Sequence, residues 1–308
     1  MLKKIAYKKF IIATISLLII SFVYHYNVDN YNYKTTLTYI KEETIPIYLI
    51  DKYNYVARYN INNKTNNNEE LIKYIIDCLT INKSSYLLPI GFTSIIPEGT
   101  KLLSYSIEDD LLKLNFSKEF LNIDEFLEEK MIEAIVYSML EIKNINKVIL
   151  YVDGTKLDKL PNSKKNLPNI LDKNIGINKT FNISSIKDTF KTTTYYISKI
   201  NDIYYYVPVT SIENNSKEKI EIIIENLKTS PSFNTSLMSF LKSNAELLDY
   251  EILENSISLS FNNHIFNLNN FSIEEEVKYS IALSIRDSYN INEVLFYVDK
   301  VLVDALNI

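Results

Sequence analysis

The chain has 308 residues, of which 46% are hydrophobic and 23% charged, as in a folded protein of about two domains. Its 33 Lys and Arg against 38 Asp and Glu give a net charge of −5, which argues against nucleic-acid binding because that binding depends on excess cations. Four glycines and a single cysteine, Cys78, leave no glycine-rich nucleotide loop and no intramolecular disulfide.

The first 26 residues have the pattern of a membrane segment, in which Lys3, Lys4, Lys8 and Lys9 precede an uncharged stretch over 10–24. A helix of this length spans about 22 Å, short of the roughly 30 Å hydrocarbon core, and flanking lysines and tyrosines can cover the difference. Because no small-residue cleavage pattern follows, an uncleaved anchor is favoured over a cleaved signal peptide, and the lysines argue against a buried helix. We therefore predict a single-pass protein of the bacterial cell membrane, with a cytoplasmic N-terminus and transmembrane helix in 1–26, a spacer in 27–44 and an extracytoplasmic body.

The rest of the chain repeats itself. Four pairs of segments align at offsets of 145 to 148, namely 71–79 with 219–227, 102–107 with 247–252, 112–116 with 257–261, and 144–153 with 290–299. These matches predict two copies of one domain, over 45–157 and 191–308, joined by a linker over 158–190.

Both copies show the same order of predicted elements. Extended segments open each copy, over about 45–59 and 194–210, and an amphipathic helix follows. A hairpin comes next, then a second helix, over 125–142 behind an Asp124 cap in copy one and behind a capping box at Ser272 in copy two. A final strand closes each copy. We expect an α+β fold of two tandem small domains, each with two helices packed on a β-sheet.

Few residues suggest chemistry. His25 and His264 are the only histidines, so neither a Ser-His-Asp triad nor a His-rich metal site is expected. The acidic run 108–110 suits a solvated turn or an acid–base pair, and Cys78 suits a buried thiol or a nucleophile; the first interpretation is favoured in both cases. The tyrosines at 195–196 and 204–206 suit strand residues, which we favour, or a carbohydrate-stacking surface.

Four motifs in copy one carry a resemblance to a known family. An I-P-x-G-T-x-L-L stretch at 96–103, an N-x-S-x-x-F segment at 115–120, an apolar helix at 135–140 and V-I-L-Y-V-D-G at 148–154 follow one another in this order. With them, copy one resembles the GerMN domain of sporulation and spore germination proteins. Copy two keeps the hairpin and the closing strand, but it lacks the I-P-x-G-T stretch and has Lys300 in place of Gly154.

The resemblance implies domains similar to the ring-building motifs of secretion and sporulation channels, here behind a transmembrane helix. It implies a non-enzymatic extracytoplasmic protein that assembles or localises a ring-like envelope complex between mother cell and forespore. The expected partners are the cytoplasmic membrane and other sporulation-complex proteins or further copies of the chain, with no cofactor, metal or small-molecule substrate. The motif residues expected to serve structure or interaction are Pro97, Glu98, Gly99, Thr100, Asn115, Ser117, Asp153 and Gly154. The alternatives are a peptidoglycan- or glycan-binding module of the cell wall and an envelope hydrolase.

Overall fold

The computed structural model describes residues 44–308 except 64, 66, 84–87, 186, 188, 215, 230–235, 268–270 and 290. Glu43–Ile308 form one compact unit. The predicted anchor in 1–26, and the spacer as far as residue 43, lie outside the described residues. In the part of the chain that is described, no helix combines the length and the apolar character needed to cross a membrane.

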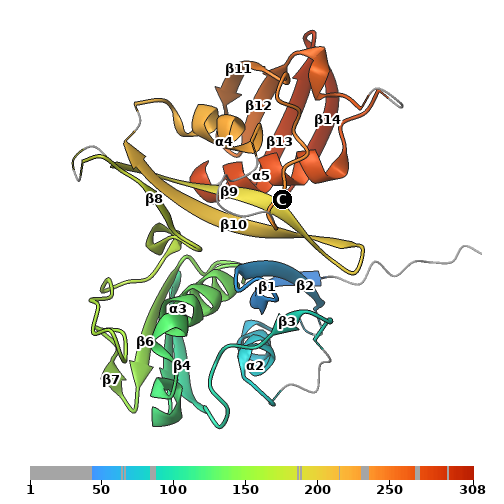
Figure 1. The fold of residues 1–308 in the computed structure, drawn as a ribbon. Helices are drawn as coiled ribbons and strands as arrows, with labels where there is room; N and C mark the ends of the chain where they lie inside the picture. Colours follow the sequence, from blue (N-terminus) through green and yellow to red (C-terminus); the bar gives the residue numbers. More distant parts are fainter. Residues whose placement is uncertain are drawn as a thin grey trace, which may run out of the picture. The chain divides into compact units, whose positions relative to one another are not determined.

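Each copy consists of an opening hairpin, two α-helices and a four-stranded sheet (Figure 1). The elements of copy one are β1 (Thr44–Asp51), β2 (Val56–Asn62), α2 (Asn68–Leu79), β3 (Phe92–Thr93), β4 (Leu102–Glu108), β5 (Leu111–Phe116), the 3-10 turn η1 (Lys118–Leu121), α3 (Glu125–Met139), β6 (Lys147–Val152) and β7 (Thr155–Lys156). Those of copy two are β9 (Thr189–Ile200), β10 (Ile203–Asn214), α4 (Lys219–Leu227), β11 (Leu247–Ile252), β12 (Ser256–Phe261), η3 (Asn263–Ile265), α5 (Glu275–Tyr289), β13 (Glu293–Val298) and β14 (Val301–Asn307). The prediction of two tandem α+β domains is confirmed.

The two four-stranded sheets have the same topology. Their strand orders are β4-β5-β6-β7 and β11-β12-β13-β14, and the central pairs, β5 with β6 and β12 with β13, run parallel while the outer pairs run antiparallel. The parallel pair is joined by a crossover through the second helix, α3 or α5. Parallel neighbours end at the same edge of a sheet, so this topology decides which loops meet.

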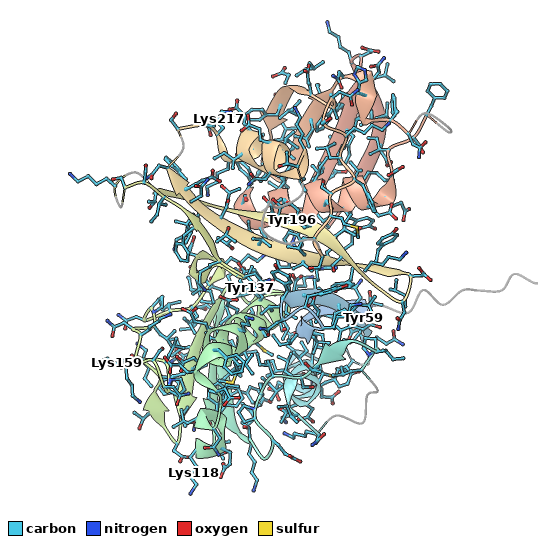
Figure 2. All side chains as sticks on the ribbon, viewed as in Figure 1. Tyr59, Lys118, Tyr137, Lys159, Tyr196 and Lys217 are labelled. Atoms are coloured by element: carbon cyan, nitrogen blue, oxygen red, sulfur yellow. The ribbon has the colours of Figure 1, made fainter. Side chains whose placement is uncertain are left out.

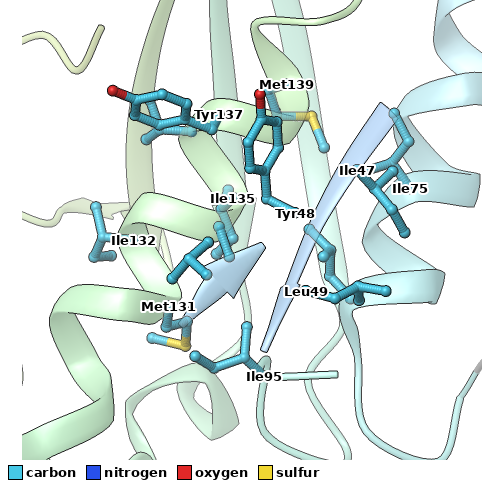
Figure 3. Close-up of a cluster of buried hydrophobic side chains, with 14 of the residues drawn as sticks. Ile47, Tyr48, Leu49, Ile75, Ile95, Met131, Ile132, Ile135, Tyr137 and Met139 are labelled. Atoms are coloured by element: carbon cyan, nitrogen blue, oxygen red, sulfur yellow. The ribbon is translucent and has the colours of Figure 1, made fainter. Parts of the chain in front are cut away.

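The core of copy one lies around α3, which is buried on every side from Met131 to Met139. In Figure 3, Ile47 of β1 lies beside Ile75 of α2, and Tyr48 of β1 lies beside Tyr137 of α3, with ring centroids 5.4 Å apart. The inward-facing residues of β5 and β6 belong to the same hydrophobic cluster. A helix buried on every side is a core helix, and its polar side chains Glu133 and Ser138 accept from the backbone N–H groups of Asn178 and Tyr48.

The hairpin turn that closes each copy has one conformation despite different residues. Asp153 and Gly154 have φ values of 45° and 76°, and Asp299 and Lys300 have 49° and 64°. Two successive positive φ values are typical of the tight turn that matches the twist of a hairpin. The replacement of Gly154 by Lys300 therefore changes the side chain and keeps the backbone.

The segment predicted as a linker, 158–190, is largely folded onto the domains. Leu160, Leu171 and Ile177 are buried in the hydrophobic cluster of copy one, and Leu171 exchanges two backbone hydrogen bonds of 2.8 Å with Val148. The segment also contains the 3-10 turn η2 (Lys173–Ile175) and β8 (Thr180–Asn182), which pairs in parallel with β10. Its proline and asparagine content suggested a spacer, but its scattered apolar residues fill places in the core.

Two helix ends differ from the prediction. Asp124 occupies the N-cap position of α3 but makes no side-chain cap hydrogen bond, and the helix ends at Met139 instead of 142. Helix α5 begins at Glu275 and not directly after Ser272, because the carbonyl of Glu274 accepts from the Lys278 N–H.

Candidate functional site

The residues of the family motif meet at one edge of the sheet in copy one. Since β5 and β6 are parallel, the loops after Phe116 and Val152 leave at the same edge, and β4, which is antiparallel to β5, begins there. This edge, called the motif edge below, contains Pro97, Glu98, Gly99, Thr100, Asn115, Ser117, Asp153 and Gly154. That these residues serve structure or interaction stays a prediction.

Hydrogen bonds join the three loops of the motif edge. The Asn115 Oδ1 accepts from the Gly154 N–H at 2.9 Å, and the Ser117 Oγ accepts from the Lys101 N–H at 3.0 Å. The Asp153 N–H donates to the Phe116 carbonyl at 2.9 Å. Asn115 and Ser117 thus hold the neighbouring loops by backbone groups that would otherwise lack partners.

The turn before β4 has the conformation that its proline and glycine require. The Thr100 N–H donates to the Pro97 carbonyl at 3.2 Å, and Gly99 has a φ of 82°, which few other residues adopt without strain. Pro97 and Thr100 are buried, while Glu98 is exposed. Within the described part of the chain, the Thr100 hydroxyl has no hydrogen-bond partner.

A shallow groove of about 240 Å³ lies next to the motif edge on the outer face of the sheet. Its polar lining comes from Ser104, Ser106, Lys113, Asn115 and Tyr151. The Glu108 carboxylate accepts from the Lys113 ammonium at 2.7 Å and raises the pKa of that lysine. A lysine held in its charged form is a poor nucleophile, so this groove is suited to binding polar groups by hydrogen bonds.

The acidic run forms the turn between β4 and β5. Asp109 has a φ of 55°, and Asp110 pairs with Lys147 at 3.1 Å, which lowers the pKa of the Asp110 carboxyl. A carboxyl that is ionised and paired is not poised to donate a proton. Among the described residues there is no group of three or more His, Cys, Asp and Glu side chains that could hold a metal ion.

Most tyrosines of the two sequence clusters are not on the surface. Tyr195, Tyr196 and Tyr205 are buried, whereas Tyr204 is 44% exposed. The carbohydrate-stacking alternative for these clusters is therefore wrong, because both tyrosines of the β9 cluster and the middle tyrosine of the β10 cluster are buried. Cys78 is also buried, as the favoured interpretation expected.

A second set of polar residues lies between the two copies and was missed from the sequence. It is called the interdomain cluster here, and it contains Tyr48, Glu141, Lys173, Tyr195, Arg286 and Asp287. The Tyr48 and Tyr195 hydroxyls lie 2.9 Å apart; Tyr48 donates to Glu141 at 3.0 Å and Tyr195 to Asp287 at 2.7 Å. The backbone N–H groups of the two tyrosines donate to Ser138 and Ser284, both at 2.8 Å.

The members of the interdomain cluster are equivalent by the internal repeat. Tyr48 corresponds to Tyr195, Ser138 to Ser284 and Glu141 to Asp287, at offsets of 146 or 147. Each copy therefore contributes a tyrosine from its first strand, a serine from its second helix and a carboxylate, which lies on α5 in copy two and just after the end of α3 in copy one. The signal in the sequence is a serine followed three residues later by a carboxylate at the same place in both copies, with hydrogen-bond partners far away in the chain.

Two cations neutralise the buried carboxylates. Arg286 forms a two-pronged contact with Glu141, at 2.7 and 3.1 Å, and Lys173 pairs with Asp287. Burial by itself would raise the pKa of Glu141, but Arg286 holds it below its usual value; at Asp287, Lys173 and Arg286 together have the same effect against burial. Burial also raises the pKa of both tyrosines well above the ordinary value, so both hydroxyls stay protonated. The arrangement is charge-balanced, so removing one partner would leave an uncompensated buried charge at the contact between copies.

The opening hairpins of the two copies join into one six-stranded sheet. Strands β2 and β10 pair directly only at Arg58 and Tyr206. Beside this pair, the Asn178 amide accepts from the Val56 N–H at 2.9 Å and donates to the Val56 and Pro208 carbonyls at 2.8 and 2.7 Å. A side chain from the predicted linker thus supplies hydrogen bonds between the hairpins beside the point where their strands pair.

Comparisons with a family model, with a known protein and with a solved structure all relate this chain to sporulation and spore germination proteins. The family model described as "Germane: Sporulation and spore germination" matches residues 46–158. The spore germination protein GerM of Bacillus subtilis (strain 168) is 27% identical over 256 residues, which cover 80% of this chain and 69% of that protein. The solved structure of the tandem GerMN domains of the sporulation protein GerM from Bacillus subtilis has a TM-score of 0.76 at 27% identity, covering 83% of this chain and 91% of that one. The similarity includes both copies.

Proposed function

Because the chain is a GerM-like sporulation and germination protein with two tandem GerMN domains, we propose that it is a non-enzymatic assembly protein of the sporulation envelope. In this role it assembles or localises a ring-like complex between mother cell and forespore. The observation that carries the proposal is the match to GerM across both domains in one arrangement, since 91% of the tandem GerM structure is covered. A likeness confined to one domain would support a fold and no more.

The distribution of polar contacts supports a scaffold. The interdomain cluster and Asn178 hold the two copies together through buried groups, whereas most residues of β4 and β11 are exposed. A rigid pair of domains with free outer strands presents binding surfaces at a constant separation. Assembly proteins need such surfaces more than they need a closed pocket.

Attachment to the membrane is part of the proposal. The lysine-flanked stretch 10–24 supports a single transmembrane anchor with the N-terminus in the cytoplasm and the two domains outside. The membrane and other sporulation-complex proteins are then the partners.

The proposal is tested with a fluorescent fusion of the full chain, imaged through sporulation. We expect enrichment at the engulfing membrane, and the same fusion without residues 1–26 should lose its membrane signal. A uniform signal in vegetative cells without enrichment during engulfment would refute the sporulation role. Co-purification of the full chain with ring components is the biochemical counterpart.

The groove at the motif edge favours a second candidate, a wall-binding module. Tyr151 supplies an aromatic surface, and Ser104, Ser106 and Asn115 supply hydrogen-bonding groups of the kind that bind glycans. In that case the purified chain should sediment with peptidoglycan and the Tyr151→Ala variant should not. Equal recovery of the two proteins in the pellet would remove this candidate.

A further inference from the structure

Each copy has a groove between its first helix and the first strand of its sheet. In copy one, α2 and β4 border a hollow of about 430 Å³, and in copy two, α4 and β11 border one of about 560 Å³. The two hollows are equivalent by the internal repeat, since Ile76 corresponds to Ile224 and Leu102–Tyr105 to Leu247–Tyr250. They are called the lysine groove and the carboxylate groove below.

The charges of the two grooves are opposite. The lysine groove has three lysines and one carboxylate in its lining, namely Lys73, Lys83, Lys101 and Asp77. The carboxylate groove has four carboxylates and one lysine, namely Glu221, Glu225, Glu246, Asp249 and Lys228. At equivalent positions Lys73 is replaced by Glu221 and Lys101 by Glu246. The sign of the charge is therefore reversed, while the helix and strand that border the groove are equivalent.

Internal ion pairs do not remove this difference. In the lysine groove, Asp77 is neutralised by Lys83 at 2.8 Å. The Glu69 carboxylate also lies nearby and accepts from the Tyr105 hydroxyl at 3.0 Å, so three lysines face two carboxylates. In the carboxylate groove, Glu225 pairs with Lys217, which is labelled in Figure 2. Burial, followed by Glu218, Glu221 and Asp249, raises the pKa of Tyr250, in agreement with a negative potential there.

The strands that border the grooves are both sheet edges. Strands β4 and β11 each pair with one neighbour in their four-stranded sheets, so one side of each backbone is not used within the described sheets. Leu103 and Leu248 stand at equivalent positions on these strands and are 49% and 62% exposed. Exposed edges that carry aliphatic side chains are typical sites of association with another chain.

We propose that the lysine groove of one molecule binds the carboxylate groove of a second copy of this chain. The contact places opposite charges around the two exposed leucines and lets the edges of β4 and β11 approach each other. Because the two surfaces differ, the association is head to tail, and a dimer keeps one free groove of each sign to which further copies can bind. Grooves of like sign repel, which sets the direction of the chain of molecules. The inference rests on the proposed assembly function and names the self-contact within it.

The test is a charge swap measured by sedimentation velocity on the purified full-length chain in a non-ionic detergent. Wild-type protein should form concentration-dependent oligomers that weaken as salt rises from about 50 to 500 mM. The Lys73→Glu/Lys101→Glu variant has two acidic grooves, and the Glu221→Lys/Glu246→Lys variant has two basic ones. Each alone should self-associate at least about tenfold more weakly, while a mixture of the two should associate again.

A matched control separates this contact from general charge effects. Lys143→Glu/Lys159→Glu changes the net charge by the same amount as Lys73→Glu/Lys101→Glu, at exposed positions outside the grooves, and it should leave self-association as in the wild type. All altered residues are exposed, and circular dichroism melting curves should coincide. Monomeric wild-type protein, or oligomers that neither reversal weakens, would overturn the inference.

The same variants distinguish this inference from the proposed function. If the fluorescent fusion reaches the engulfing membrane but the protein stays monomeric, the self-contact is wrong and the proposed function stands. If the charge swap behaves as expected but the fusion never concentrates at that membrane, the proposed function is wrong and the self-contact stands.

Discussion

The Tyr48 and Tyr195 hydroxyl oxygens lie 2.9 Å apart, although the two residues are separated by 147 positions and occupy equivalent strands of different copies. Each hydroxyl has one proton, and three short contacts share these two protons, with Glu141, with Asp287 and between the tyrosines. Arg286 and Lys173 balance the carboxylates. The contact between copies is therefore a duplicated polar motif packed against itself, and four consequences can be measured.

The first prediction concerns the serines that accept from the buried strands. Replacing Ser284 by Ala leaves the Tyr195 N–H without its acceptor, and Ser138→Ala does the same to Tyr48. Each change should lower the free energy of unfolding by about 1–3 kcal/mol. Urea denaturation measures it.

Ser280 is the matched control, one turn earlier on α5. Its hydroxyl is buried and has no hydrogen-bond partner in the described part of the chain. Ser280→Ala should therefore be neutral or slightly stabilising. A loss equal to that of Ser284→Ala would show that any buried serine matters equally here.

The second prediction concerns Arg286. Arg286→Met removes the cation in direct contact with both Glu141 and Asp287 and leaves Lys173 and the nearby Arg58, and it should cost about 3–5 kcal/mol of unfolding free energy. Lys165, which pairs with Glu129 at 3.5 Å on the surface and is 65% exposed, is the control. Lys165→Met should change stability by less than about 0.5 kcal/mol. Similar losses in the two variants would refute the structural role of the interdomain cluster.

The third prediction is a pH dependence. The folded-state pKa values of Glu141 and Asp287 are lowered below those of the unfolded chain, about 4.3 and 3.9. Lowered values mean that the stabilisation is fully present above these unfolded values and is lost as the pH falls through the folded ones. Stability measured by guanidinium unfolding should therefore decline below about pH 4.

The variant Glu141→Gln/Asp287→Asn identifies the source of this decline. It should be less stable than the parent at pH 7 but should lose less stability on further acidification. Asp51 and Glu133 act in the opposite direction, because burial raises the pKa of both carboxyls. Parallel stability curves for parent and variant would assign the acid sensitivity to other groups.

The fourth prediction concerns Asn178. Asn178→Ala removes three hydrogen bonds to Val56 and Pro208 and should cost about 2 kcal/mol or more, because partly buried backbone groups lose their partners. Asn169, an exposed asparagine of the same segment that accepts from Lys156, is the control, and its alanine variant should be near neutral. Thermal unfolding measures the midpoints of the two variants. Equal midpoints would show that Asn178 does not join the hairpins.

The amino-acid sequence by itself determined the elements and their duplication. Helix and strand periodicities at Ile72–Leu79 and Leu112–Phe116, and the turn residues Pro97 and Gly99, depend on neighbours in the chain, so they could be read without a structure. The convergence of Asn115 and Gly154 at the motif edge was not among these predictions, because it depends on the parallel pairing of β5 with β6.

Only the tertiary structure decided what lies between the copies. Glu141 and Ser138 bind residues that are 90 or more positions away in the chain. Asn178 binds Val56 from a segment predicted as a linker. No local pattern in the sequence specifies such pairs. The burial of α3 on all sides, and the docking of Leu171, depend in the same way on surfaces that exist only after the sheets have formed. Local propensity selects the elements, whereas the exclusion of water from polar groups selects how two equivalent domains pack together.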